Sequence, residues 1–193
     1  MADASARVSE GSCDVLVVGG GPAGSTIAAL LAERGEHVVL VEKDRHPRFH
    51  IGESLLPFNL PLFEQLGIKD DIAKIGMPKY GVEFVPINHD QPSAFEFANA
   101  WDKNFPYAYQ VRRSEFDHIL LKNAAAKGAT VIEECKVTEV AFPPQGGAMA
   151  VGRDVDGKQR TKMIFTGQPH YRKNALLYWS CDRDHPERAS KRA

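Results

Sequence analysis

The sequence predicts an α/β fold, and three observations near its beginning carry this prediction. Residues 15–18 form a short run of mostly β-branched apolar residues, which is typical of a parallel strand buried on both faces. A glycine-rich turn and an Ala- and Leu-rich helical stretch at about 23–34 follow this run. A second apolar run at 38–41 then completes a strand–helix–strand unit.

The turn between the first strand and the helix predicts a phosphate-binding site. Gly19, Gly21 and Gly24 have the G-x-G-x-x-G spacing. The first glycine permits a tight turn, the second lets the backbone approach a pyrophosphate, and the third lets the helix pack closely on the strands. Pro22 stands in the first helical turn, where its missing N–H costs little. The N-terminal end of the helix would then face the phosphates.

An acidic residue completes the unit. Glu42 directly follows the second apolar run, where a carboxylate can accept hydrogen bonds from ribose hydroxyls. A glycine turn between an ordinary strand and helix is the alternative interpretation of the G-x-G-x-x-G spacing alone. Because strand, helix and acid occur in register here, we predict that the unit binds a dinucleotide cofactor, a flavin or a nicotinamide.

Further elements are predicted along the rest of the chain. Helices are expected at about 60–66, at 70–75, and from Ser114, as N-cap, to Gly128, as C-terminal stop. Short antiparallel strands are expected at 81–86, 94–98 and 107–111. Strands are also expected at 130–132 and 136–142, and a hairpin through Asp156 and Gly157 would join 148–153 to 158–165.

Composition narrows the class of protein. The 193 residues carry a net charge of −1, which gives no electrostatic reason to expect nucleic acid as a partner. No apolar stretch is long enough to span a bilayer, and the N-terminus lacks a secretory signal. Cys13, Cys135 and Cys181 form no C-x-x-C pair. We therefore expect a cytoplasmic protein without disulfides and without a structural metal.

The chain divides into three parts on this evidence. Residues 1–12 are small and polar, and we expect them to be flexible. Residues 13–165 would form the cofactor-binding domain, with an antiparallel β insertion at about 80–111. Residues 166–193 are basic and polar without sustained apolar periodicity, and we expect an atypical, disordered tail.

Three segments make residues 13 to about 162 resemble the N-terminal part of flavin-dependent halogenases and related FAD-dependent monooxygenase-like oxidoreductases. They are the glycine-rich turn at 19–26, the stretch at 48–57 with its Ile-Gly-Glu-Ser core, and Gln-Val-Arg-Arg-Ser-Glu-Phe-Asp at 110–117. The second segment is the most specific of the three. Geranylgeranyl-reductase-like oxidoreductases are the neighbouring group.

This resemblance implies a Rossmann-like FAD-binding three-layer ββα domain, with an inserted antiparallel β region on the substrate side, incomplete at the C-terminus. It implies FAD as the cofactor. The residues that would bind FAD are Gly19, Gly21, Pro22, Ala23, Gly24 and Ser25 at the pyrophosphate, Glu42 at the ribose, Arg48 and Ser54 at the flavin and phosphates, Arg112 at the diphosphate or ribityl chain, and Val137, through its backbone, at the adenine. For Arg48 and Arg112 a solvated surface charge is the alternative.

Lys79 is the catalytic residue that the resemblance implies. Halogenases carry a lysine in a Lys-x-Gly-x-x-Phe setting, which Lys79, Gly81 and Phe84 match. In that family reduced FAD reacts with dioxygen, and the flavin hydroperoxide oxidises halide to hypohalous acid, which the lysine holds beside a small-molecule substrate. A separate flavin reductase supplies reduced FAD. The alternative for Lys79 is a solvated lysine at a strand edge.

The chain departs from the family after about residue 162. The later FAD segments and the Trp-x-Trp-x-Ile-Pro signature of halogenases do not follow, and Trp179 stands alone. We therefore expect a truncated or frame-shifted chain with weak FAD retention and little turnover. A geranylgeranyl-reductase-like flavin reductase and a non-catalytic dinucleotide-binding remnant are the alternative functions.

Overall fold

The computed structural model describes residues 9–85, 87, 92–142, 144, 148–165 and 175–178. Its helices are α1 (Pro22–Glu33), α2 (Leu60–Leu66), α3 (Lys69–Ile75) and α4 (Arg113–Ala126). Its strands are β1 (Ser9–Ser12), β2 (Val15–Val18), β3 (Val38–Val41), β4 (Met77–Lys79), β5 (Gly81–Phe84), β6 (Ser93–Glu96), β7 (Ala108–Gln110), β8 (Thr130–Ile132), β9 (Lys136–Ala141), β10 (Ala148–Arg153), β11 (Gln159–Phe165) and β12 (Ala175–Tyr178).

A parallel sheet of order β12-β2-β3-β8 forms the middle layer. Alternate residues of its central strands point to opposite faces, as the two-residue period of a strand requires. Val17 and Leu40 pack into one buried cluster with α1 and α4, whereas Leu16 and Val39 pack into a second cluster on the other face. Both faces of β2 and β3 are therefore buried, which explains their unbroken apolar sequences.

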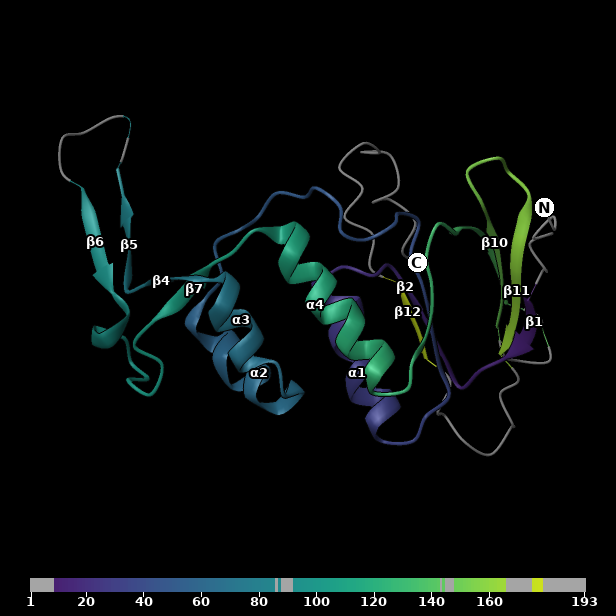
Figure 1. Ribbon diagram of the computed structural model, residues 1–193, viewed down its shortest axis with the longest axis horizontal. Helices are drawn as coiled ribbons and strands as arrows, with labels where there is room; N and C mark the ends of the chain where they lie inside the picture. Colours follow the sequence, from purple (N-terminus) through teal and green to yellow (C-terminus); the bar gives the residue numbers. More distant parts are fainter. Residues whose placement is uncertain are drawn as a thin grey trace.

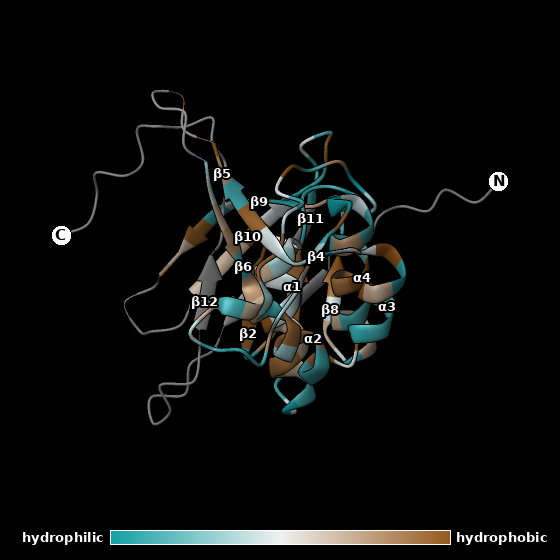
Figure 2. Ribbon diagram, turned by 90° about the vertical axis from the view of Figure 1, so that its left-hand side faces the viewer, coloured by the Kyte–Doolittle hydropathy of each residue, from teal (hydrophilic) through white to brown (hydrophobic). Residues whose placement is uncertain are grey.

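Helices α1 and α4 cover one face of the parallel sheet and lie side by side (Figure 1). Small residues, Ala28 and Ala29 on α1 and Ala124 on α4, are fully or almost fully buried. Leu120 and Leu121 of α4 fill the space around them. In Figure 2 hydrophobic colour gathers around β2, inside the layers.

A second sheet of order β1-β11-β10-β9 forms the third layer. The hairpin between β10 and β11 turns at Gly157, whose φ of 78° is readily adopted by glycine. Ala148 and Ala150 of β10 pack against the second cluster, together with Cys13 and Cys135. A layer of helices, a parallel sheet and a second, mixed sheet thus follow one another, which confirms the predicted three-layer ββα domain.

A separate group at the other end of the molecule consists of strands β4, β5, β6 and β7 (Figure 1). Strand β4 pairs antiparallel with β7, and β5 pairs antiparallel with β6 in a hairpin that projects away from the helices (Figure 1). Helices α2 and α3 lie between this group and α4 (Figure 1). The antiparallel character of this region was predicted, but β4 was not, because Met-Pro-Lys offers no alternating pattern.

Helix α4 begins two residues earlier than predicted. Ser114 was expected to be the N-cap, but the N-cap is Arg112, and no side chain caps the helix. The amides of Glu115 and Phe116 both donate to the Arg112 carbonyl. The early start has a physical cause, because the Arg113 side chain pairs with Asp117 one turn later.

Three further expectations differ from the structure. Residues 97 and 98 belong to a 3₁₀ turn (Phe97–Asn99) rather than to a strand. Residues 9–12, expected to be flexible, form β1 beside β11, and residues 175–178 of the expected tail form β12 beside β2. Edge strands such as these pair through the main chain and need no regular side-chain pattern. Residues 1–8, 166–174 and 179–193 lie outside the described residues.

We expect Gly24→Ala to lower the free energy of unfolding by about 1–3 kcal/mol, the usual cost of overpacking. A Cβ at Gly24 would lie 1.9 Å from the Gly19 carbonyl oxygen, so α1 would have to move away from β2. Urea denaturation measures the change. Gly21→Ala is the matched control, because its Cβ would meet only Arg48 Nη2, at 3.9 Å. Equal stability of the two variants would contradict this close approach.

Candidate cofactor site

A cavity of about 500 Å³ lies at the carboxyl ends of β2 and β3. Its walls are the glycine-rich turn, residues 41–44 and 48–50, residues 135–137 at the start of β9, and Arg113 of α4. Ligands of open parallel sheets bind at this edge, outside the carboxyl ends of the strands. The geometry of the cavity therefore agrees with the position predicted from the sequence.

The glycine-rich turn presents main-chain groups to this cavity. Gly21 is the N-cap of α1, and no side chain caps the helix. The amides of the first helical turn are thus available to an anion, which the helix dipole also favours. A Cβ at Gly21 would meet only the tip of Arg48, so the glycine leaves room in the cavity for a group that approaches the backbone. The turn fits a diphosphate.

Glu42 is 3% exposed and ties the second strand to the glycine-rich turn. Its Oε2 accepts a hydrogen bond from the Gly20 amide, and its Oε1 accepts one from the Asp44 amide at 2.9 Å. A carboxylate has about four acceptor directions, so these two bonds leave capacity for a ribose hydroxyl. Glu42 lines the cavity, and its bond to ribose stays a prediction.

Arg48 extends into the same cavity among three carboxylates. Its Nε lies 3.9 Å from Glu42 and 3.5 Å from Asp44, and its Nη1 lies 3.8 Å from Asp117. Within the described residues, the buried Nε has no hydrogen-bond partner. A buried donor without a partner is costly, and the attraction of the nearby carboxylates offsets part of this cost. The surface-charge alternative does not describe Arg48, whose side chain is 16% exposed.

Arg113 and Asp117 are the site residues that sequence reasoning missed. Asp117 is fully buried and accepts two hydrogen bonds from Arg113, from Nε at 2.7 Å and from Nη2 at 3.0 Å. Arg113 lines the cavity, whereas Arg112 points to the surface and pairs with Glu115 at 3.5 Å. The signal was available, because an arginine and an aspartate four residues apart share one helix face.

The structure brings most of the predicted cofactor residues together. Those that line the cavity are Gly19, Gly21, Pro22, Ala23, Gly24, Glu42, Arg48 and Val137. Ser25 lies behind the turn and donates to the Gly20 carbonyl at 3.0 Å. Ser54, Lys79 and Arg112 lie outside the cavity walls, so the cofactor roles of Ser54 and Arg112 remain predictions.

Lys79 and Ser54 lie together on the antiparallel side of the molecule. Lys79 Nζ donates a hydrogen bond to Ser54 Oγ and lies 5.6 Å from the centre of the Phe97 ring. Burial lowers the pKa of Lys79 below its usual value. These contacts exclude the alternative of a fully solvated lysine.

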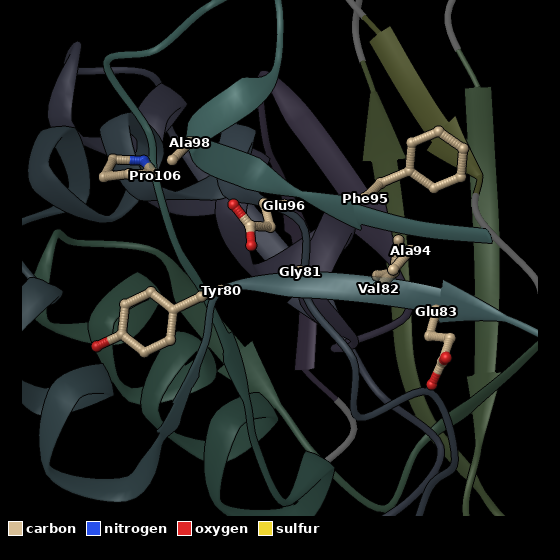
Figure 3. Close-up of a pocket in the computed structure, with 9 residues that line it drawn as sticks. All are labelled: Tyr80, Gly81, Val82, Glu83, Ala94, Phe95, Glu96, Ala98 and Pro106. Carbon is tan, nitrogen blue, oxygen red and sulfur yellow. The ribbon is translucent and has the colours of Figure 1, made fainter. Parts of the chain in front are cut away.

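An open pocket of about 660 Å³ lies along the β5–β6 hairpin. The first residue that lines it, Tyr80, directly follows Lys79 in the chain. Figure 3 shows Tyr80 near one end and Phe95 toward the other, with Glu96 between them. The amide of Phe97 donates to the Tyr80 carbonyl at 2.8 Å, which joins the end of this hairpin to the lysine region. The pocket combines aromatic and aliphatic walls with carboxylates.

Two histidines stack near Arg48, of which His46 is buried and His118 is partly buried. His46 is 5% exposed, and its ring stacks on that of His118 with 6.4 Å between centroids. Burial, then the nearby Arg48, lowers the pKa of His46, although Glu42, Asp117 and Glu133 act in the opposite direction. Burial and then Lys122 lower the pKa of His118, which Glu133 opposes. Both rings therefore favour the neutral form.

The structure bears on three other features of the sequence. In the described part of the chain, no cluster of three His, Cys, Asp or Glu side chains could hold a metal ion. None of the helices in these residues is long and apolar enough to cross a membrane. Cys13 and Cys135 are buried and form no disulfide, and burial raises the pKa of Cys13 to about 12. Cys181 lies outside the described residues.

Comparison with known proteins identifies the family. A family model described as an FAD binding domain matches residues 12–162. This chain belongs to the FAD binding domain family. The match confirms FAD as the cofactor that the sequence predicted, and the matched residues include every wall of the cavity.

Individual relatives confirm the resemblance to halogenases. The chain is 39% identical over 159 residues to the flavin-dependent halogenase gsfI of Penicillium aethiopicum, covering 78% of this chain and 30% of the relative. The structure of the myxobacterial chondrochloren halogenase CndH matches with a TM-score of 0.71 at 32% identity, covering 83% of this chain and 38% of that one. A flavoprotein/dehydrogenase from Cytophaga hutchinsonii matches with a TM-score of 0.71 at 34% identity, covering 80% and 37%. This chain therefore spans less than two fifths of the length of these relatives.

We expect Gly21→Ala to weaken FAD binding by about tenfold or more, equivalent to about 1.4 kcal/mol. The added methyl group would occupy the space that the structure leaves beside the backbone and Arg48 Nη2. Titration of flavin fluorescence measures the affinity. Gly35→Asn is the control, because position 35 has a φ of 87° that asparagine tolerates and has no neighbour within 4 Å. Unchanged affinity in Gly21→Ala would place the diphosphate elsewhere.

We expect the protein to lose stability as the pH falls below the ordinary histidine pKa of about 6.5. Since burial lowers the pKa of His46 in the folded protein, the unfolded chain binds its proton first and acid favours unfolding. Above that pH both states are neutral and no effect is expected. Thermal unfolding at a series of pH values should show a smaller acid loss in His46→Phe than in the wild type. The exposed His37 supplies the control, and an equal effect of His37→Phe would contradict this prediction.

Proposed function

We propose that this protein is an FAD-dependent oxidoreductase of the halogenase type, which oxidises a halide for transfer to a small-molecule substrate. One observation carries the proposal. Lys79, the lysine of the Lys-x-Gly-x-x-Phe segment, is partly buried and held by Ser54 of the Ile-Gly-Glu-Ser segment. The similarity to flavin-dependent halogenases over the same residues supports it.

The chain's own residues would hold FAD in the cavity described above. The main chain of Gly19, Gly21, Pro22, Ala23 and Gly24 would bind the diphosphate, with Ser25 fixing the turn from behind. Arg48 and Arg113 would supply positive charge, Glu42 would accept from the ribose, and Val137 would meet the adenine through its backbone. Ser54 and Arg112 would approach the flavin end. Bound in its reduced form, FAD would reduce dioxygen to the peroxide level, and that oxygen would oxidise the halide.

Lys79 would hold the oxidised halogen near the substrate. As an ammonium group it donates a hydrogen bond to hypohalous acid. As a neutral amine, which burial favours, it takes the halogen from hypohalous acid, forming an N–halogen bond and releasing water. Either form keeps the oxidant from diffusing away.

The substrate and partners follow from the same proposal. The pocket along β5–β6 (Figure 3) would receive a small substrate with apolar or aromatic groups that match Tyr80, Val82 and Phe95. A separate flavin reductase would supply reduced FAD. The buried free thiol of Cys13 supports a cytoplasmic location, because a reducing compartment keeps thiols in this state.

We expect Lys79→Met to abolish halogenation while FAD affinity stays within about twofold of the wild type, because Lys79 lies outside the FAD cavity. The measurement is a bromide-dependent mass increase of an electron-rich aromatic substrate, with chemically reduced FAD and dioxygen supplied. Lys103→Met replaces an exposed lysine and serves as the control.

Two results would count against the halogenase proposal. Equal product from Lys79→Met and the wild type would remove the lysine from the reaction. A wild-type protein that binds FAD but gives no bromide-dependent product would instead favour a flavoprotein that does not halogenate. The flavoprotein/dehydrogenase from Cytophaga hutchinsonii is a structural neighbour whose name does not describe a halogenase.

A further inference from the structure

We propose that Ser54 is the positioning residue of Lys79, which fixes the lysine amine relative to the cofactor cavity. The proposal rests on the function proposed above, in which Lys79 holds the oxidised halogen. It gives Ser54 a role different from the cofactor contact that the sequence implied. The contact itself is direct, since Lys79 Nζ donates to Ser54 Oγ.

The strand pairing sets the two side chains on one face. Strand β7 lies between them, with Ser54 opposite Gln110 on one side and Lys79 opposite Ala108 on the other. Gln110 and Ala108 are two residues apart, so their partners point to the same face of this small sheet. Ser54 and Lys79 therefore lie on the same face of the sheet with β7 between them, and the long lysine side chain crosses β7 to reach the serine hydroxyl.

Main-chain hydrogen bonds on both sides of Ser54 fix its backbone. The Leu55 amide donates to the Tyr109 carbonyl at 3.0 Å, and the Val111 amide donates to the Glu53 carbonyl at 2.9 Å. A serine side chain has a single heavy-atom rotation once its backbone is fixed. The hydroxyl is thus a well-defined acceptor, although the residue itself is exposed.

The same segment is held from the cofactor cavity. Arg113 Nη1 donates to the Ile51 carbonyl at 2.7 Å and to the Gly52 carbonyl at 3.4 Å. Gly52 has a φ of 95°, and a Cβ there would lie 3.0 Å from Arg113 Nη1. One side chain of the cavity wall therefore grips the chain two residues before Ser54. Because Ser54 follows this segment, the two hydrogen bonds of Arg113 link the position of Lys79 to the wall of the cofactor cavity.

Ser54 also acts on the charge of the lysine. Burial lowers the pKa of Lys79, and Phe97 lies 5.6 Å from its Nζ. A hydroxyl that accepts from the ammonium form stabilises that form and opposes the effect of burial. Removing the hydroxyl should therefore leave a more mobile and more readily deprotonated amine.

The test is competitive acetylation of the full chain with acetic anhydride, read by mass spectrometry of Lys79 against Lys103 between about pH 7 and 11. In Ser54→Ala we expect the rate at Lys79 to rise about three- to tenfold near pH 8, and its pH profile to move to lower pH. Ser54→Thr keeps the hydroxyl and should match the wild type. Ser93→Ala removes an exposed serine of β6 and should leave Lys79 unchanged.

An unchanged Lys79 profile in Ser54→Ala would overturn the proposal. Should Ser54→Ala not fold, Ser54→Cys, which replaces the hydroxyl by a weak acceptor, gives the same readout with the same expected direction. The test needs no turnover, so it separates the two proposals. A shifted profile with no halogenation by the wild type would contradict the proposed function alone, and the reverse pattern would contradict the role of Ser54 alone.

Discussion

The cofactor cavity depends on the pairing of the buried Asp117 carboxylate with two arginines. This carboxylate is fully buried on α4, binds Arg113 through two hydrogen bonds, and lies 3.8 Å from Arg48. An unpaired carboxylate in such a place would be strongly unfavourable, and removing one partner of a buried pair costs about 3–5 kcal/mol. The two arginines, from α4 and from the segment after β3, are thereby held in one cavity wall. An anionic ligand then meets two cations that are already in position.

The same network connects two regions of the molecule. Arg113 binds Asp117 with one edge of its guanidinium and the carbonyls of Ile51 and Gly52 with Nη1. A lysine has no planar fork and could not make both sets of bonds at once. The segment that Arg113 grips continues into Ser54 and the strand pairing with β7. The cofactor cavity and Lys79 are thus joined by covalent chain and hydrogen bonds rather than by separate loops.

The sequence predicted the middle of the domain better than its edges. Strands β2 and β3 are buried on both faces, so their continuous apolar runs identify them, and the glycine spacing identifies the turn. Strands β1 and β12 lie beside β11 and β2 and pair through their main chains, which leaves little trace in side-chain patterns. Arg113, which lines the cavity, was missed for a related reason. Two adjacent arginines differ only in the helix face they occupy, and the helix start was predicted two residues late.

We infer that main-chain amides of the glycine-rich turn, together with Arg48 and Arg113, bind the adenine-diphosphate half of FAD. Titration of flavin fluorescence with the intact chain, with ADP and FMN as competitors, tests it most directly. We expect saturable binding of FAD that ADP displaces and FMN does not, because FMN lacks the adenosine and the second phosphate. Displacement by FMN as effective as by ADP, or no saturable binding of FAD, would contradict it.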